Sequence, residues 1–181
     1  MTTELDSPDH LAEIQRALLA KPALRALYEE RYRAFEHRVR SVDPLLGDLL
    51  ELGSGGGFIQ EILPEIVTSD VIPYEGVDRV LDATAMDLPD GSLRGIFLLN
   101  VFHHIPNVSL FLTEAARTLS PGGVLYISDQ YPGWLARPIL KYAHHEPFDD
   151  RTLEWRFESR GPLSDANGAL PWNVFFRDRA R

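Results

Sequence analysis

The residues best suited to chemistry are the glycines that follow a short apolar segment near the first third of the chain. Gly53, Gly55 and Gly57 stand at alternate positions, and Glu51 precedes the first of them by two residues. Glycine has no Cβ, so the backbone can turn sharply there and a ligand can lie directly against it. We therefore expect an apolar strand, this loop and an amphipathic helix in succession, with a nucleotide-type ligand on the loop.

The spacing of the glycines narrows the choice of ligand. A phosphate-binding P-loop ends in Gly-Lys-Ser/Thr, and that ending is absent here. The dinucleotide pattern G-x-G-x-x-G needs its third glycine where this chain has Phe58, which disfavours an NAD-dependent oxidoreductase. What remains is an acidic residue followed by glycine at every second position. As an alternative, the glycines only close a tight turn in a site that has lost its function.

Four further segments follow the glycines in order. One apolar run ends in Asp70, and a second run ends in Asp82 and Ala83. A third ends in Asn100 and continues into a histidine pair, and a fourth carries Leu-Ser-Pro-Gly-Gly at residues 119–123. Together with the glycine pattern, these segments resemble the class I S-adenosylmethionine-dependent methyltransferases, in particular the small methyltransferase type 11-like family. The resemblance covers residues 47–130.

The resemblance implies an α/β fold, a Rossmann-like doubly wound parallel sheet with strand order 3-2-1-4-5. We expect one domain with three zones: an N-terminal helical lid over residues 1–42, a cofactor-binding core over residues 43–130 and an acceptor-side segment over residues 131–181. Lys21-Pro22 should divide the first zone into two helices. The last zone shows one strand-like run, residues 172–176, so the family's hairpin of strands 6 and 7 is expected to be incomplete or absent. A truncated C-terminus is one explanation.

The resemblance also implies the cofactor, S-adenosylmethionine, and the residues around its sugar and amino acid. The methionine and ribose portion is expected over the glycine loop, including Ser54, with Glu51 facing the ammonium group. Asp70 is expected to accept hydrogen bonds from both ribose hydroxyls, since charge-assisted bonds of this kind are strong. The alternative for Asp70 is a turn or helix-cap residue.

The adenine is expected further along the same edge of the sheet. Val71 and Ile72 offer an apolar wall, with Ile72 preferred, and Asp82 and Ala83 correspond to the family's residues near the adenine amino group. An Asx turn is the alternative role of Asp82. Asn100 should flank the crevice opposite the glycine loop, because ligands of open parallel sheets bind where the strand order reverses.

Catalysis is expected at His103 and His104, directly after the fourth strand, with His103 slightly preferred. A neutral imidazole there could take a proton from the nucleophile as it attacks the methyl carbon. Equally, one histidine could pack while the other faces the site, because methyl transfer depends mainly on alignment. No metal site is expected, since His103-His104 and His144-His145 are two distant pairs without a readable ligand geometry.

Bulk composition favours a globular cytoplasmic protein. The chain has 181 residues, 44% of them hydrophobic and 25% charged, and it contains no cysteine. No run approaches the length of a membrane span, and the first ten residues are polar and acidic, unlike a signal peptide. The net charge of −9 argues against nucleic acid as a partner, and the basic residues after Phe176 are expected to form a solvated tail.

The predicted function is methyl transfer to a small-molecule oxygen, nitrogen or carbon nucleophile. The alternative is a non-catalytic methyltransferase-like domain that binds cofactor or a protein. Residues 134–155 are expected to shape the acceptor pocket, and Tyr28, Tyr32 and Phe35 to line a lid or, alternatively, to form an ordinary core stripe. Without a hairpin, residues 124–127 would form an open edge, covered by residues 172–176 or by a second copy in a homodimer.

Overall fold

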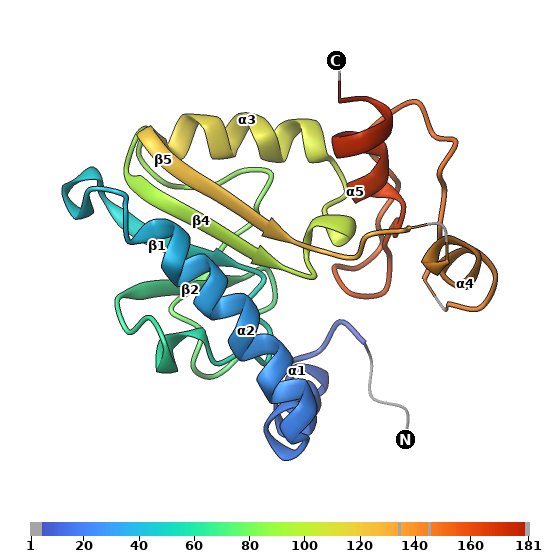
Figure 1. The fold of residues 1–181 in the computed structure, drawn as a ribbon, viewed down its shortest axis with the longest axis horizontal. Helices are drawn as coiled ribbons and strands as arrows, with labels where there is room; N and C mark the ends of the chain where they lie inside the picture. Colours follow the sequence, from blue (N-terminus) through green and yellow to red (C-terminus); the bar gives the residue numbers. More distant parts are fainter. Residues whose placement is uncertain (1–4, 134, 145, 180–181) are drawn as a thin grey trace.

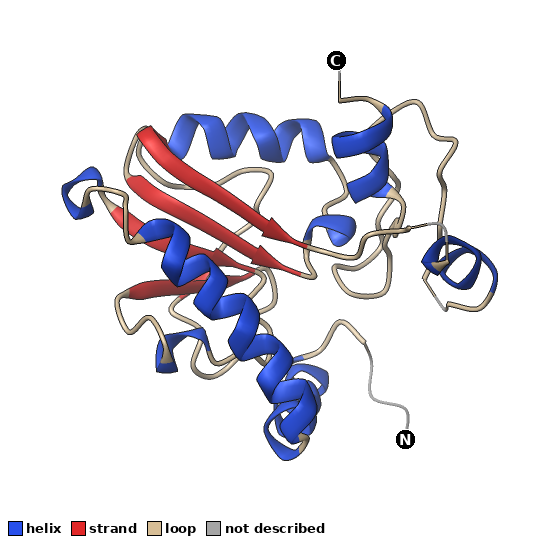
Figure 2. Ribbon diagram, in the orientation of Figure 1, coloured by secondary structure: helices blue, strands red, loops and turns tan. Residues whose placement is uncertain are grey.

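The computed structural model describes residues 5–133, 135–144 and 146–179, which form a parallel sheet between helical layers (Figures 1 and 2). The strands are β1 (Asp48–Leu52), β2 (Ile66–Asp70), β3 (Arg79–Val80), β4 (Leu93–Leu99) and β5 (Leu119–Ser128). Every pairing is parallel and the order is β3-β2-β1-β4-β5. The α/β fold and the strand order predicted from the sequence are confirmed.

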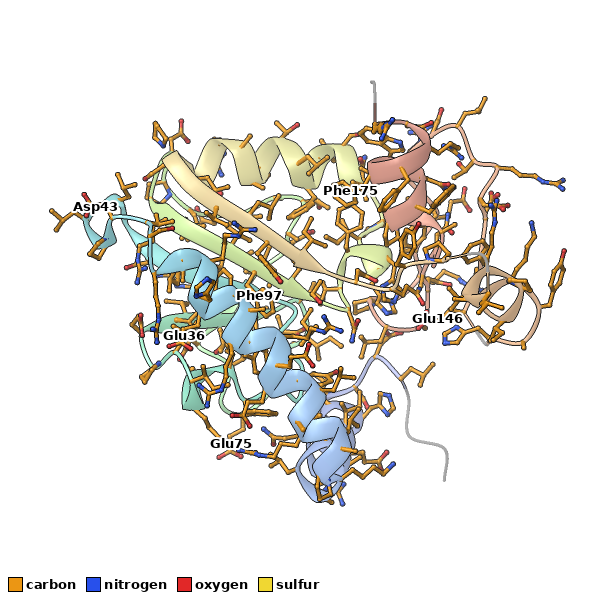
Figure 3. All side chains as sticks on the ribbon, viewed as in Figure 1. Glu36, Asp43, Glu75, Phe97, Glu146 and Phe175 are labelled. Atoms are coloured by element: carbon orange, nitrogen blue, oxygen red, sulfur yellow. The ribbon has the colours of Figure 1, made fainter. Side chains whose placement is uncertain are left out.

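The central strands β1 and β4 are buried along most of their length because both faces of the sheet are covered. On one face α2 (Pro22–Val39) places Phe35 against Phe97, with ring centroids 4.7 Å apart and stacked. On the other face α3 (Val108–Thr118) buries Phe111 and Ala115 in a cluster with Ile96 of β4. Phe97 is labelled in Figure 3, where α2 crosses the sheet. This double coverage holds the strand ends rigidly at one edge.

The N-terminal zone forms two helices, as predicted. The first, α1 (Pro8–Ala20), begins at Ser7, whose hydroxyl accepts a hydrogen bond from the backbone N–H of His10 at 3.3 Å. Lys21 is extended between α1 and α2, because the residue before a proline avoids the helical region. Proline is tolerated at the first position of each helix, where its missing N–H has no partner to lose. Among the described residues, no helix is long and apolar enough to cross a membrane.

The prediction of a helix after the glycine loop is wrong. Only a 3₁₀ turn, η2 (Ile59–Glu61), connects the loop to β2. The run between Phe58 and Pro64 is too short to nucleate an α-helix, and Leu63 precedes a proline. The link from β2 to β3 likewise has no helix in the part of the chain that the structure describes, so α3 is the one described α-helix between β1 and β5. Two further 3₁₀ turns of the same length are η1 (Pro44–Leu46) and η3 (Phe102–His104).

The strand predicted at residues 172–176 is also wrong. Following α4 (Ala136–Tyr142), the chain ends in α5 (Leu170–Trp172) and a π-helical turn, η4 (Asn173–Arg177). Leu170 and Val174 are four residues apart and both enter the core cluster beneath α3, a spacing that a helix satisfies and a strand does not. The described residues therefore contain no strand 6/7 hairpin of the family, and β5 pairs with β4 alone.

Candidate active site

A cavity of about 500 Å³ lies at the carboxyl ends of the neighbouring strands β1 and β4. This is the position at which parallel α/β sheets bind ligands, because the crossovers leave the sheet in opposite directions there. In Figure 1, α1 and the start of α2 lie off this edge of the sheet. The predicted cofactor residues on the cavity wall are Glu51, Gly53, Ser54, Gly55, Gly57, Asp70, Val71, Asp82, Ala83 and Asn100.

The glycine loop needs glycine for two different physical reasons. Gly53 and Gly55 have φ of +67° and +50°, a backbone region that favours glycine. A Cβ on Gly53 would lie 2.5 Å from Val101, and one on Gly57 would lie 2.4 Å from the Tyr32 hydroxyl oxygen. A Cβ on Gly55, by contrast, would meet no atom closer than 3.9 Å. The loop is thus packed tightly beneath and leaves backbone open at Gly55 for a ligand.

Glu51 presents an unsatisfied carboxylate at the cavity. Its side chain is 2% exposed, and its Oε2 atom is buried with no hydrogen-bond partner. Burial raises the pKa of Glu51 to about 7, against the opposing effect of a Ser54 hydrogen bond and together with the nearby charge of Asp70. A buried polar atom without a partner is costly. A cationic ligand group in the cavity would supply the missing partner.

Asp70, at the end of β2, reaches the cavity and also supports the loop around it. Its Oδ2 accepts a hydrogen bond from Gly55 N–H at 2.9 Å, and its Oδ1 accepts one from Ile72 N–H at 3.0 Å. Burial raises the pKa of this carboxyl, while those two bonds oppose the rise. Asp70 is therefore a turn residue and a cavity residue at once, so the two roles considered for it are compatible.

On the far side of Asp70 the structure chooses between the predicted adenine contacts. Val71 is 47% exposed and lines the cavity, whereas Ile72 is 6% exposed and does not. The preference for Ile72 was therefore wrong, since its side chain turns into the protein. Asp82 lines the cavity and forms the Asx turn, because its Oδ1 accepts hydrogen bonds from Thr84 N–H at 2.7 Å and Thr84 hydroxyl at 2.8 Å.

Asn100 joins the strand edge to the N-terminal helices. It has φ of +56°, and its backbone N–H donates to Ser128 carbonyl oxygen at 2.8 Å. A hydrogen bond with Asn100 opposes the rise that burial causes in the pKa of Tyr28. Tyr28 and Tyr32 line the cavity, whereas Phe35 belongs to the core beneath α2. The sequence had not distinguished α1 as the main contributor of apolar wall, through Leu11, Ile14 and Leu18.

The two neighbouring histidines of η3 differ in whether their side chains border the cavity. His104 lines the cavity, but His103 is 5% exposed and lies behind it, with its Nδ1 2.7 Å from Asp129 Oδ1. Burial alone would lower the pKa of His103, but its ion pairs with Asp129 and Glu146 outweigh this and raise it to about 9. Burial and the charge of His103 lower the pKa of His104. Of the pair, His104 is the one that can meet a ligand.

One side of the cavity is formed by residues that the sequence did not indicate. Within the described part of residues 134–155 no side chain lines the cavity, and Trp134 and His145 lie outside the described residues. Residues 159–163 line it instead. Asp6 Oδ1 accepts hydrogen bonds from the N–H groups of Leu163 and Ser164, which ties this loop to the start of α1. The residue types of this loop do not indicate that it lines a cavity or contacts the start of α1.

Comparison with known proteins agrees with this geometry. A family model for the methyltransferase domain matches residues 15–161, which include all five strands of the sheet and the glycine loop. The chain belongs to the methyltransferase domain family. The predicted membership of the S-adenosylmethionine-dependent methyltransferases is thereby confirmed, together with the S-adenosylmethionine cofactor of that family.

This methyltransferase domain is similar in sequence to two proteins of known name and in fold to one solved structure. It is 31% identical over 115 residues to the ubiquinone biosynthesis O-methyltransferase of Azorhizobium caulinodans, covering 53% of this chain and 46% of that protein. It is 34% identical over 65 residues to the 2-methyl-6-phytyl-1,4-hydroquinone methyltransferase of Synechocystis sp., covering 36% of this chain and 20% of that protein. The chain thus spans less than half the length of both relatives.

The solved structure is that of a Methanococcus maripaludis protein provisionally assigned as an S-adenosyl-L-methionine-dependent methyltransferase. The TM-score is 0.55 at 14% identity, covering 76% of this chain and 70% of that one. At this identity the likeness concerns the fold alone, and it agrees with the strand order of the methyltransferase domain.

Proposed function

We propose that this domain holds S-adenosylmethionine in the cavity between β1 and β4 and transfers its methyl group to a small-molecule nucleophile. The observation that carries the proposal is the meeting of an open glycine loop, the unsatisfied Glu51 carboxylate and Asp70 on one cavity wall. The bound cofactor supplies a methyl group that its sulfonium centre has already activated. The chain's own task is to bind, to orient and to exclude water.

Each residue on the wall suits one part of the cofactor. Glu51 would pair with the ammonium group, which gives its Oε2 atom the partner that it lacks. Each oxygen of Asp70 accepts one backbone hydrogen bond and retains a lone pair for a ribose hydroxyl. Val71 would lie against the adenine, and Asp82 and Ala83 would lie near its amino group. The residues present therefore fit the group.

We further propose an aromatic acceptor of the hydroquinone or phenol class. Both relatives are named for quinone-related chemistry, one as an O-methyltransferase. Leu11, Ile14 and Leu18 of α1 make one wall apolar, which suits a ring and an attached hydrocarbon. We propose that α1 and α2 act as the lid of this site. The assignment of His103 and His104 as catalytic residues stays a prediction, and only His104 borders the cavity.

Calorimetry tests the cofactor, and product analysis tests the transfer. We expect S-adenosylhomocysteine to bind with a micromolar dissociation constant, about −8 kcal/mol, and NAD to bind no more than marginally. Incubation with S-adenosylmethionine and a set of hydroquinones, catechols and amines should yield a methylated hydroxyl or ring. Binding of NAD without binding of S-adenosylhomocysteine would refute the proposal. Binding without transfer to any acceptor would favour the non-catalytic alternative.

A further inference from the structure

Three side chains of the metal-ligand type meet behind the cavity wall. They are His103 and His104 of η3 and Glu146 of the segment that follows α4, and one ligand atom from each lies within 4.8 Å of the others. Their side chains are 6%, 15% and 19% exposed, so the cluster is largely enclosed. Glu146 is labelled in Figure 3, between α4 and the carboxyl end of the sheet. The sequence could not indicate this meeting, because Glu146 is distant from the histidines along the chain.

Both imidazole rings are held by their Nδ1 atoms. His103 Nδ1 lies 2.7 Å from Asp129 Oδ1, and His104 Nδ1 lies 3.1 Å from the backbone carbonyl oxygen of Asp165. A carbonyl oxygen only accepts, so Nδ1 of His104 carries the hydrogen and its Nε2 carries the lone pair. Metal-binding histidines are oriented in this way, with the second nitrogen donating to a carboxylate or a backbone carbonyl.

Both Nε2 atoms face the same carboxylate. His103 Nε2 is 3.4 Å from Glu146 Oε2, and His104 Nε2 is 3.8 Å from Glu146 Oε1. These separations exceed the roughly 2.7–3.2 Å of an ordinary hydrogen bond. They are close to the distance of about 3.4 Å that separates two ligand atoms bound tetrahedrally to one zinc ion at about 2.1 Å each.

The cluster can hold one positive charge, supplied either by a proton or by a metal ion. As a proton it lies on His103, whose Nε2 faces Glu146 Oε2, while the lone pair on His104 Nε2 faces Glu146 Oε1. A metal ion that displaces this proton would be bound by both Nε2 atoms and the carboxylate together. Two imidazoles and one carboxylate form a donor set that zinc and neighbouring transition metals prefer, whereas calcium and magnesium prefer oxygen alone.

We propose that His103, His104 and Glu146 bind one divalent transition-metal ion, with zinc the best match to the ligands. Asp129 and the Asp165 carbonyl orient the two rings as positioning groups, and water completes the coordination. The ion would fasten the segment after α4 to the turn after β4, immediately behind the cavity wall at His104. The metal site goes beyond the methyltransferase function and does not depend on it.

The test uses the full chain after treatment with a chelator. Calorimetry with Zn²⁺ should give one ion per chain, and Co²⁺ should give the intense visible absorption of a tetrahedral site. The variants His104→Gln and Glu146→Gln each remove one ligand at similar volume and should weaken binding by about 100-fold or more. Asp129→Asn should weaken it by about 10–100-fold, as expected for a residue that orients a ligand. His37→Gln, an exposed histidine on α2, is the matched control and should change nothing.

Two further readouts separate the metal site from protein folding and from the methyltransferase proposal. Zn²⁺ should raise the melting temperature of the unaltered chain and of His37→Gln, and not that of Glu146→Gln. S-adenosylhomocysteine binding, measured on the same samples, reports an intact core and tests the cofactor site independently. Co²⁺ and Zn²⁺ binding no tighter in the unaltered chain than in the folded His104→Gln/Glu146→Gln double variant would overturn the metal site. That result would leave a proton-bridged network in its place.

Discussion

At the scale of single residues, the feature with the largest consequence is the buried Glu51 carboxyl. Folding raises its pKa from 4.5 to about 7, so the native state binds this proton more tightly than the unfolded chain does. The favourable contribution is therefore complete below pH 4.5 and is lost as the pH rises through about 7. A buried carboxylate that destabilises the ligand-free protein at neutral pH is typical of a binding site, because a cationic ligand can compensate its charge.

Glu51→Gln should accordingly have opposite effects on stability and on binding. At pH 8 the buried Glu51 carboxyl must be ionised, which costs free energy, whereas the amide of the variant stays neutral. The variant should therefore be more stable than the parent at pH 8 by up to about 3 kcal/mol, at about 1.4 kcal/mol per pKa unit. Near pH 4.5 the difference should nearly vanish. Cofactor affinity should fall by about 1.5–3 kcal/mol, because a charged hydrogen bond is lost. Urea unfolding at both pH values and calorimetry check this, and a variant that binds S-adenosylhomocysteine as tightly as the parent would contradict it.

Asp70 should affect the fold as well as the ligand. Its carboxylate accepts hydrogen bonds from the backbone N–H groups of Gly55 and Ile72. Asp70→Ala should therefore cost about 2–3 kcal/mol of cofactor affinity and in addition about 1–3 kcal/mol of unfolding free energy. Thermal and urea unfolding of the ligand-free variant measure the second effect. Parental stability in that variant would show that water replaces the carboxylate.

At the scale of elements, α1 packs directly against the glycine loop, and the proposed lid depends on this contact. A Cβ on Gly56 would lie 2.5 Å from the backbone nitrogen of Gln15, although Gly56 is not among the residues with positive φ. Gly56→Ala should therefore act through this contact alone and displace α1, at a cost of about 1–3 kcal/mol. We expect faster hydrogen exchange in α1 and weaker S-adenosylhomocysteine binding. Gln15→Ala leaves the backbone contact in place and serves as the control; equal effects from both variants would argue against the lid.

The sequence predicted those elements whose local pattern and tertiary environment agree. Residues 66–70 form β2 as expected, because Ile66, Val67 and Thr68 are β-branched and favour a strand packed within the sheet. The failures share a cause. Helix formation after Phe58 was limited by the length of the connection and by Pro64, and residues 172–176 became helical because the core beneath α3 receives Leu170 and Val174. Local patterns do not report such constraints.

The residues of the candidate site likewise divide into those that a local motif indicates and those that only the tertiary structure brings to the site. Gly55 and Asp70, which follow strand ends, could be placed at the site from their resemblance to the motifs of the methyltransferase family. The loop of residues 159–163 and Glu146 reach the site only through the path of the whole chain. The sequence pattern also could not tell which of two adjacent side chains faces the cavity. The structure places Val71 and His104 there, and not their neighbours Ile72 and His103.

At the scale of the whole molecule, the open edge of β5 stands out. The strand pairs with β4 on one side, and within the described residues no strand pairs with its other side. The sequence offered residues 172–176 as a cover, but these residues are helical and donate no ladder of hydrogen bonds. Unpaired N–H and C=O groups along an exposed strand favour pairing with another chain. Residues 172–176 therefore do not pair with this edge, so it can be covered by a second copy or by further strands of a longer chain.

We therefore expect this chain to form a homodimer through β5 in solution. Two copies related by a twofold axis would pair their β5 strands antiparallel and so satisfy both edges with one interface. Sedimentation equilibrium should show a mass that rises toward that of a dimer with concentration. Hydrogen exchange should show β5 amides that become protected over the same range, while those of β1 are protected throughout, since β1 lies between β2 and β4. A mass that stays monomeric, with the outer amides of β5 exchanging freely at every concentration, would show that the isolated edge is tolerated as it stands.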